Sequence, residues 1–99
     1  MNGYAVTFLS PAYEDLAAAL QNIGAFSKNA AEKFIDDLER QTEYLETMPM
    51  MYPACENFPP YRRMVLGDYL VFYLVDDAKH TVEIYRILPA RMDLRQFFG

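Results

Sequence analysis

Seven apolar or aromatic residues follow one another without interruption from Tyr69 to Val75. Such a run, rich in β-branched and aromatic side chains, is typical of a central β-strand that is covered on both faces, or nearly so. The dipeptide Gly67-Asp68 separates this run from Arg63–Leu66, and a two-residue turn that contains glycine favours a tight hairpin. The chain must therefore build a sheet around Tyr69–Val75.

Two helices are predicted upstream of this hairpin. The first begins at Ser10-Pro11, because serine is a good N-cap and proline suits the first helical position, and it ends at Gly24. The second begins at Ser27, its N-cap, and runs to Pro49 with an apolar stripe opposite an acidic one. The short connection between them implies an antiparallel helical hairpin with one shared apolar face.

The remaining segments complete the order β-α-α-β-β-β. Tyr4–Ser10 and Thr81–Leu88 are predicted strands, and Pro49–Pro60 is a loop. In the last strand, alternation places Val82, Ile84, Arg86 and Leu88 on one face. We expect an α+β fold: an N-terminal strand, a helical hairpin and a three-strand antiparallel meander in one mostly antiparallel sheet, with the helices on one face. No linker is visible, so residues 1–99 are expected to form a single domain.

Charge is distributed unevenly along the 99 residues. The net charge is −5, from 9 Lys and Arg against 14 Asp and Glu, which argues against a general binder of polyanions. Five of the six arginines lie after residue 56, whereas nine of the fourteen acidic residues lie before residue 57. The acidic half and the arginine-bearing half are expected to have different functions.

The sequence contains no pattern for a disulfide, a metal site, a membrane span or a signal peptide. Cys55 is the only cysteine, so no intramolecular disulfide can form, and nothing pairs it with histidines at metal-binding spacing. No apolar run is long enough for a membrane span, and the first residues lack the pattern of a signal peptide. We expect a cytoplasmic protein that holds no metal or cofactor and does not enter a membrane.

The sheet face away from the helices has no second helical layer left to cover it. The predicted strands concentrate arginines and the tyrosines Tyr61, Tyr69, Tyr73 and Tyr85, so we expect this face to be an interaction surface. The alternative for Arg63 and Arg86 is structural pairing across strands with Glu83 or Asp68, worth about 0–1 kcal/mol if exposed. Both interpretations stay open at this point.

Three segments, taken in their order and spacing, resemble the RelE/ParE toxin superfamily. They are Phe8-Leu-Ser-Pro-Ala-Tyr-Glu-Asp-Leu16, Tyr61-Arg-Arg-Met-Val-Leu-Gly-Asp-Tyr-Leu-Val-Phe-Tyr73 and Ile84-Tyr-Arg-Ile-Leu-Pro-Ala-Arg-Met-Asp93, and the resemblance covers residues 4–98. It implies the toxin of a bacterial type II toxin–antitoxin (plasmid stabilisation) module, neutralised by a cognate antitoxin that wraps it with an extended or helical segment. A hetero-oligomer with the antitoxin and a homodimer are both left open.

The resemblance implies one of two modes of action. RelE-like members cut mRNA in the ribosomal A site with a basic cluster and a C-terminal tyrosine, whereas ParE-like members lack that cluster and poison DNA gyrase. The matching positions here are Arg62 and Arg63 for the strand-two bases, Leu70 for the strand-three arginine, Arg91 for the arginine after the last strand, and Phe97 for the tyrosine. Because cleavage needs proton acceptors and donors and arginine is a poor base, the surviving Arg63, Arg86 and Arg91 favour the ParE-like mode.

We therefore predict a toxin that binds a protein target, DNA gyrase, and has no catalytic residues of its own. The target- or phosphate-contacting candidates are Arg62, Arg63, Arg86, Arg91 and Arg95, and the antitoxin-facing aromatic candidates are Tyr61, Tyr73, Tyr85 and Phe97. One alternative is a ribosome-dependent mRNA endonuclease that uses Arg62, Arg63 and Arg91. The other is a detoxified member retained as a protein-binding module.

Overall fold

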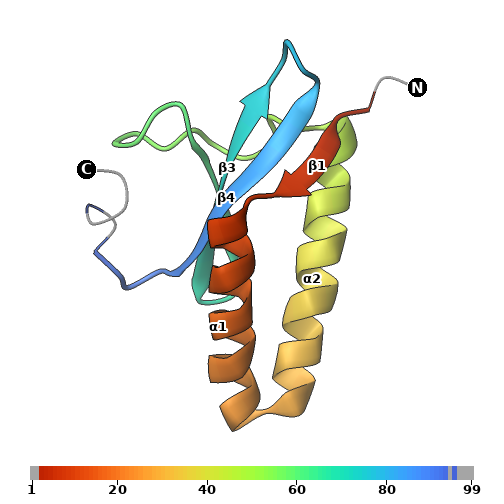
Figure 1. Ribbon diagram of the computed structural model, residues 1–99. Helices are drawn as coiled ribbons and strands as arrows, with labels where there is room; N and C mark the ends of the chain where they lie inside the picture. The colour runs from red at the N-terminus through yellow and green to blue at the C-terminus, as the bar shows by residue number, and fades with distance from the viewer. Residues whose placement is uncertain (1–2, 94, 96–99) are drawn as a thin grey trace.

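The computed structural model describes residues 3–93 and 95 (Figure 1). Its elements, in chain order, are β1 (Ala5–Phe8), α1 (Ser10–Phe26), α2 (Lys28–Thr47), β2 (Arg62–Leu66), β3 (Tyr69–Asp76) and β4 (Thr81–Pro89). This order and the α+β class are the ones predicted from the sequence. Within these described residues, neither helix combines the length and the apolar character needed to cross a bilayer.

The four strands form one sheet in the order β1-β4-β3-β2. β2, β3 and β4 make the predicted antiparallel meander, and Gly67 in the β2–β3 turn has a φ of 60°, a left-handed conformation that glycine adopts without strain. β1 pairs in parallel with β4, from Ala5 opposite Thr81 to Phe8 opposite Ile84. The sheet is therefore mixed rather than purely antiparallel, because the helical hairpin provides the long crossover that a parallel neighbour requires.

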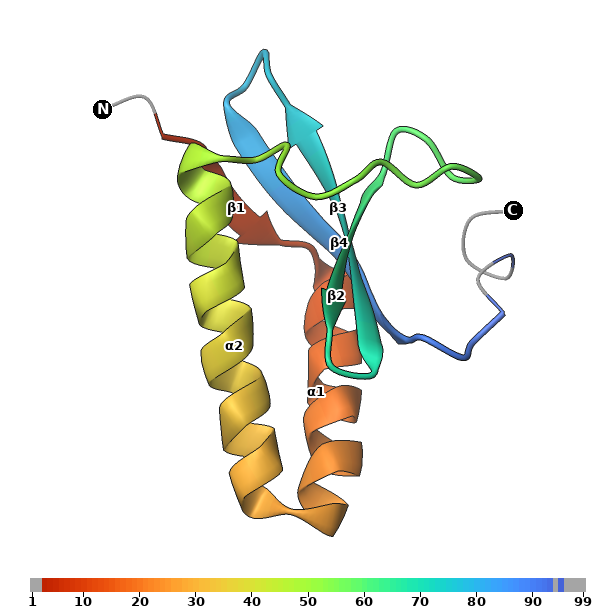
Figure 2. The same cartoon turned by 180° about the vertical axis from the view of Figure 1, so that it is seen from behind.

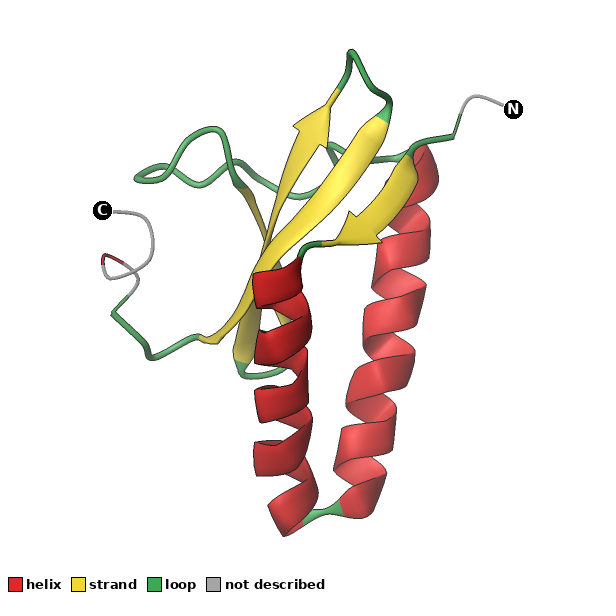
Figure 3. Ribbon diagram, in the orientation of Figure 1, coloured by secondary structure: helices red, strands yellow, loops and turns green. Residues whose placement is uncertain are grey.

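Both helices lie on the same face of the sheet, as Figure 3 shows. The Oγ of Ser27 caps α2 by accepting a hydrogen bond of 3.1 Å from a backbone N–H three residues later, and α2 ends before Pro49, as predicted. The prediction for α1 was wrong at both ends: Leu9 is the N-cap, and the helix passes Gly24 and ends at Phe26. Helical hydrogen bonding continues past Gly24, because the Ser27 backbone N–H still donates to the Ile23 oxygen at 3.0 Å, and the backbone becomes extended at Ser27.

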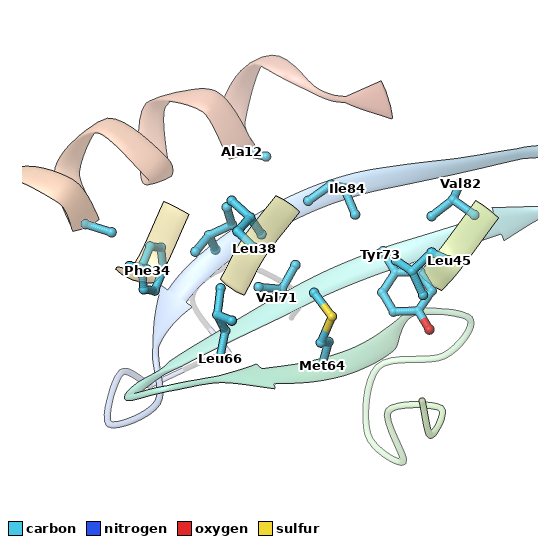
Figure 4. Close-up of a cluster of buried hydrophobic side chains, with 12 residues drawn as sticks. Ala12, Phe34, Leu38, Leu45, Met64, Leu66, Val71, Tyr73, Val82 and Ile84 are labelled. Carbon is cyan, nitrogen blue, oxygen red and sulfur yellow. The ribbon is translucent and has the colours of Figure 1, made fainter. Parts of the chain in front are cut away.

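The main hydrophobic core lies between the helices and the sheet (Figure 4). Its buried residues from the helices include Ala12, Phe34, Leu38 and Leu45, and those from the sheet include Met64, Leu66, Val71, Tyr73, Val82, Ile84 and Ile87. Tyr73 is fully buried, and its hydroxyl donates a hydrogen bond of 2.9 Å to the backbone oxygen of Pro49. The chain just beyond the C-terminal end of α2 is thereby tied to the centre of the sheet.

A β-bulge between β3 and β4 changes which residues of β4 face the helices. Phe72 pairs with Arg86, whereas the next residue, Tyr73, pairs with Ile84, so Tyr85 is the additional residue on β4. Ile84 and Ile87 are three positions apart, so strict alternation would place them on opposite faces, yet both lie in the main core. The inserted residue therefore reverses the alternation along β4. The predicted face of Val82, Ile84, Arg86 and Leu88 is therefore wrong after the bulge, because a strict period of two cannot anticipate an inserted residue.

The opposite face of the sheet, here called the far face, carries a second, smaller cluster. It consists of the buried residues Cys55, Leu70, Phe72 and Leu88, with Phe58 and Tyr61 packed against them. The segment 53–61 lies over the strands there and is fixed by backbone hydrogen bonds, from Cys55 N–H to the Tyr61 oxygen at 2.7 Å and from Arg63 N–H to the Pro53 oxygen at 3.0 Å. The far face is therefore covered in part by the chain itself, contrary to the expectation that it is open.

Candidate functional site

Arg86 is engaged in a structural ion pair. Its Nε and Nη2 donate hydrogen bonds of 2.7 and 2.8 Å to the two carboxylate oxygens of Asp15 in α1, which also accepts one of 2.9 Å from the Ile87 backbone N–H. The hydrogen bond to Asp15 raises the pKa of the Arg86 guanidinium, against the effect of burial. Arg86 is thus paired within the chain, but the predicted cross-strand partners Glu83 and Asp68 were wrong, because the carboxylate comes from Asp15 of α1.

Arg62 and Arg95 also make intramolecular contacts. Arg62 Nη1 donates to the backbone oxygens of Tyr52, at 2.7 Å, and of Met50, at 3.4 Å. It holds the segment that follows α2 against β2. Arg95 pairs with Asp93 at 3.1 Å, and these hydrogen bonds raise the pKa of Arg95 and lower that of Asp93. Of these two arginines, Arg62 would have to release a backbone contact before it could bind a phosphate.

Arg63 and Arg91 are exposed, and neither takes part in an ion pair within residues 3–93 and 95. Arg63 lies on the far face beside a pocket of about 360 Å³, whose lining includes Glu56, Asn57 and Phe58. Arg91 follows β4 and lines a different pocket, of about 370 Å³, with residues of α1 and the β2–β3 turn. Arg63 and Arg91 thus line two separate pockets and do not belong to one cluster of basic side chains.

The aromatic residues expected on the far face are divided between both faces. Tyr73 lies in the main core and cannot meet an antitoxin while the chain is folded. Tyr69 also packs toward the helices, edge-on to Phe34 with ring centroids 5.4 Å apart. Tyr61 and Tyr85 are half-buried on the far face and stack on each other with centroids 5.0 Å apart. Phe97 lies outside the described residues.

The far-face pocket contains one acid–base group that the sequence reasoning missed. Glu56 and Arg63 line the same pocket, so a carboxylate that can accept a proton lies near a guanidinium that can hold a phosphate. Little in the sequence points to Glu56, because a single acidic residue in a loop bounded by prolines matches no catalytic motif. Leu70, at the position matched to the strand-three arginine, is buried in the second cluster and brings no charge to this pocket.

His80 lies apart from both arginine pockets, whereas Cys55 lines the pocket of Arg63. His80, the only histidine, is in the β3–β4 turn, where its ring stacks on Tyr4 at a centroid distance of 4.0 Å. The thiol of Cys55 is buried, and burial raises its pKa although Arg63 lies nearby. Over the described part of the chain, no three His, Cys, Asp or Glu side chains gather closely enough to hold a metal ion.

Comparison with known proteins decides the family. The sequence model for the ParE toxin of type II toxin–antitoxin systems, parDE, matches residues 6–94. The chain belongs to the ParE toxin family. This confirms the resemblance predicted from the sequence. No curated protein matches this ParE toxin by sequence.

Solved structures with the same fold support this assignment at the level of architecture. A chain of the chromosomal ParDE system from P. aeruginosa has a TM-score of 0.73 at 17% identity, with 90% of this toxin and 98% of that chain covered. The RelBE2 toxin–antitoxin complex from Mycobacterium tuberculosis gives 0.59 at 21% identity, covering 88% and 98%. A mutant of the E. coli toxin RelE in the free state gives 0.63 at 16%, covering 90% and 85%. These similarities extend over nearly the whole chain.

Proposed function

We propose that this ParE toxin inhibits bacterial growth by binding a protein target, DNA gyrase, in the cytoplasm, and that a cognate antitoxin neutralises it. The observation that carries the proposal is the position of Arg91. Its guanidinium is exposed and lines a pocket together with the apolar side chains of Phe26 and Tyr69. An arginine beside exposed aromatic surface is typical of the centre of a protein–protein interface.

The arrangement of the other arginines supports binding over catalysis. A ribonuclease of this fold class would need a proton acceptor, a proton donor and cations around one phosphate. Arg86 is held by Asp15, and Arg62 is held by backbone oxygens. Arg63 and Arg91 line separate pockets. A toxin that acts by binding a protein target does not need these groups to surround one phosphate.

The pair of Glu56 and Arg63 favours one second candidate, a ribosome-dependent mRNA endonuclease. In that function Glu56 would take the proton of the 2′-hydroxyl and Arg63 would bind the scissile phosphate. Among the described residues, the other titratable side chain that lines this pocket is Cys55, whose thiol is buried and has a raised pKa, so the leaving oxygen would take its proton from this thiol, from the ribosome or from the solvent. This candidate therefore ranks below target binding.

Expression of the toxin without its antitoxin separates the candidate functions. Growth, plasmid supercoiling by gyrase and mRNA integrity are followed in the same cultures. Growth arrest with loss of supercoiling and intact mRNA supports the proposal. Cuts in mRNA at regular codon positions with normal supercoiling would establish the endonuclease, and unhindered growth of cells that contain folded protein would establish a detoxified binding module.

Substitution of Arg91 tests the site within this experiment. We expect Arg91→Ala to abolish growth inhibition, because the side chain is exposed and available to the target, while the melting temperature shifts by less than about 3 °C. Thermal unfolding followed by circular dichroism provides the stability measurement. Arg63→Ala and Glu56→Gln are the matched controls and should stay toxic. Full toxicity of Arg91→Ala with inactivation by either control would move the site to the far face.

A further inference from the structure

Arg91 is one of the two central residues of a β-turn at the end of β4. The turn comprises residues 89–92 and is closed by the Met92 N–H, which donates to the Pro89 oxygen at 3.0 Å. Arg91 itself is exposed and lines the pocket of about 370 Å³ described above. A turn of four residues fixes its own geometry, but its orientation relative to the sheet depends on the contact that anchors it.

A backbone hydrogen bond anchors this turn to the turn between β2 and β3. The Ala90 N–H donates to the Asp68 oxygen at 2.9 Å. Tyr69 pairs with Pro89 at the end of the β3–β4 ladder, so this bond extends the ladder by one residue into both turns. Figure 2 shows the β2–β3 turn beside the point at which the chain leaves β4. The Asp68 carbonyl therefore connects two turns that lie far apart in the sequence.

Gly67 sets the direction of the Asp68 carbonyl. It precedes Asp68 in the two-residue turn between Leu66 and Tyr69, and its φ of 60° lies in the left-handed region. A β-carbon at this position would meet no heavy atom of the described residues within 4 Å. The position is therefore restricted by backbone conformation and not by space, and a residue that disfavours a positive φ should alter the turn without a clash.

We propose that the Gly67-Asp68 turn positions Arg91 for the target: the Asp68 carbonyl holds turn 89–92 against the sheet, and the turn presents the guanidinium. This inference rests on the proposed function, in which Arg91 contacts the target. An arginine on a loose chain loses backbone freedom when it binds, whereas two hydrogen bonds already fix the backbone here. Fixing the contact residue in advance lowers the entropic cost of binding.

The substitution Ala90→Pro tests the anchoring bond directly. Proline removes the N–H that donates to Asp68, yet it suits the second position of a β-turn, and Pro89 before it is already extended in β4. Inhibition of supercoiling by purified DNA gyrase is measured with the purified full-length toxin. We expect Ala90→Pro to raise the toxin concentration needed for half-maximal inhibition by at least about 10-fold.

Substitutions of Gly67 provide a loss, a rescue and a control. Gly67→Ala should weaken inhibition as Ala90→Pro does, because alanine disfavours a positive φ, whereas Gly67→Asn should stay within about 3-fold of wild type, because asparagine tolerates it. Gly24→Ala, within α1, is the matched control and should stay within about 2-fold. Hydrogen exchange of the Ala90 amide, followed by NMR, reports the bond itself: it should be at least about 10-fold faster in Gly67→Ala and slow again in Gly67→Asn.

The outcomes distinguish this inference from the proposed function. If the wild-type toxin does not inhibit gyrase, the proposed function fails and the inference fails with it. If the wild type inhibits and Arg91→Ala does not, while Ala90→Pro and Gly67→Ala inhibit as wild type does, the positioning role is overturned and the proposed function stands. Circular dichroism checks that each variant is folded. Should Ala90→Pro not fold, the two Gly67 variants and the Ala90 amide decide, and equal exchange in both variants overturns the inference.

Discussion

The hydroxyl of Tyr73 shows how one buried polar atom can affect stability. It donates to the Pro49 oxygen at 2.9 Å in a site with no exposure to solvent. Burial raises the pKa of Tyr73 to about 12, and nearby Arg62 opposes this shift without cancelling it. The neutral phenol is thus the form that the fold requires, because a phenolate cannot donate this hydrogen bond and would be poorly solvated there.

We predict that this tyrosine makes the fold sensitive to alkali. The folded pKa of Tyr73 is about 12, against an ordinary value of 10.0. Its contribution to stability is therefore complete below about pH 10 and is lost as the pH rises through about 12. Urea unfolding at a series of pH values measures this loss. Tyr73→Phe should flatten the alkaline decline but cost about 1 kcal/mol near pH 7, because the Pro49 oxygen loses its donor. An unchanged alkaline profile in Tyr73→Phe would contradict the assignment.

The junction of α1 with β4 depends on Asp15. β4 extends past the end of β1, and Asp15 satisfies the Ile87 backbone N–H at this free edge while it pairs with Arg86. The side chains of Asp15 and Arg86 are only 13% and 19% exposed, so solvent screens the pair less than a surface ion pair. In addition to the core contacts, this carboxylate links a helix and a strand that lie far apart in sequence.

Loss of that carboxylate should destabilise the fold. We expect Asp15→Asn to lower the free energy of unfolding by about 2 kcal/mol, because the charge that holds Arg86 is removed while the side-chain shape is kept. Urea denaturation measures the change. The same substitution at exposed Asp36 of α2 is the control and should stay within about 0.5 kcal/mol. Equal effects at both positions would mean that Asp15 contributes no more than a surface charge.

The segment between α2 and β2 is held by Arg62, and Cys55 reports on it. Cys55 lies within this segment and is 7% exposed, and burial raises the pKa of its thiol. We expect Arg62→Ala to speed the reaction of Cys55 with a disulfide reagent about 10-fold, because loss of the charged donor to the Tyr52 oxygen favours local opening. Absorbance of the released thiolate follows the reaction.

Arg63→Ala is the control for this measurement. Arg63 lies close enough to Cys55 to lower the pKa of the thiol, so its removal should leave the reaction unchanged or slower. Acceleration by Arg63→Ala to the same extent would show that the segment is held by charge in general and not by the Arg62 hydrogen bond.

At the scale of the whole molecule, the negative charge lies in the helical layer. The helices span residues 10–47 apart from the cap at Ser27, and this range contains eight acidic and three basic residues, so it carries the whole net charge of −5. The remaining residues are neutral in sum. A polyanion would be repelled by the helical layer. The molecule as a whole therefore favours a protein partner, with Arg91 at the border between the acidic helices and the neutral sheet.

The features that the sequence predicts correctly are local ones. Ser27 caps α2, Pro49 follows its last turn, and Gly67 supplies the positive φ of the β2–β3 turn. Each of these depends on the conformational preference of one residue and its near neighbours. The assignment of Tyr73 to a partner surface was wrong, because this side chain is buried in the main core. The alternation of side chains along a strand shows which residues share a face, but it does not show which face packs against the helices.

By itself the sequence determined the element types and their order, because periodicity, caps and turns are encoded within short segments. The family followed from a resemblance that the matched model over residues 6–94 confirmed. Only the tertiary structure decided which arginines are available. Asp15 binds Arg86 across 71 positions of sequence, and the Tyr52 oxygen binds Arg62 across 10. A count of charges along the sequence cannot distinguish these two bound arginines from the exposed Arg91. The availability of a charged group depends on what the fold brings within hydrogen-bonding distance, and that partner can come from anywhere in the chain.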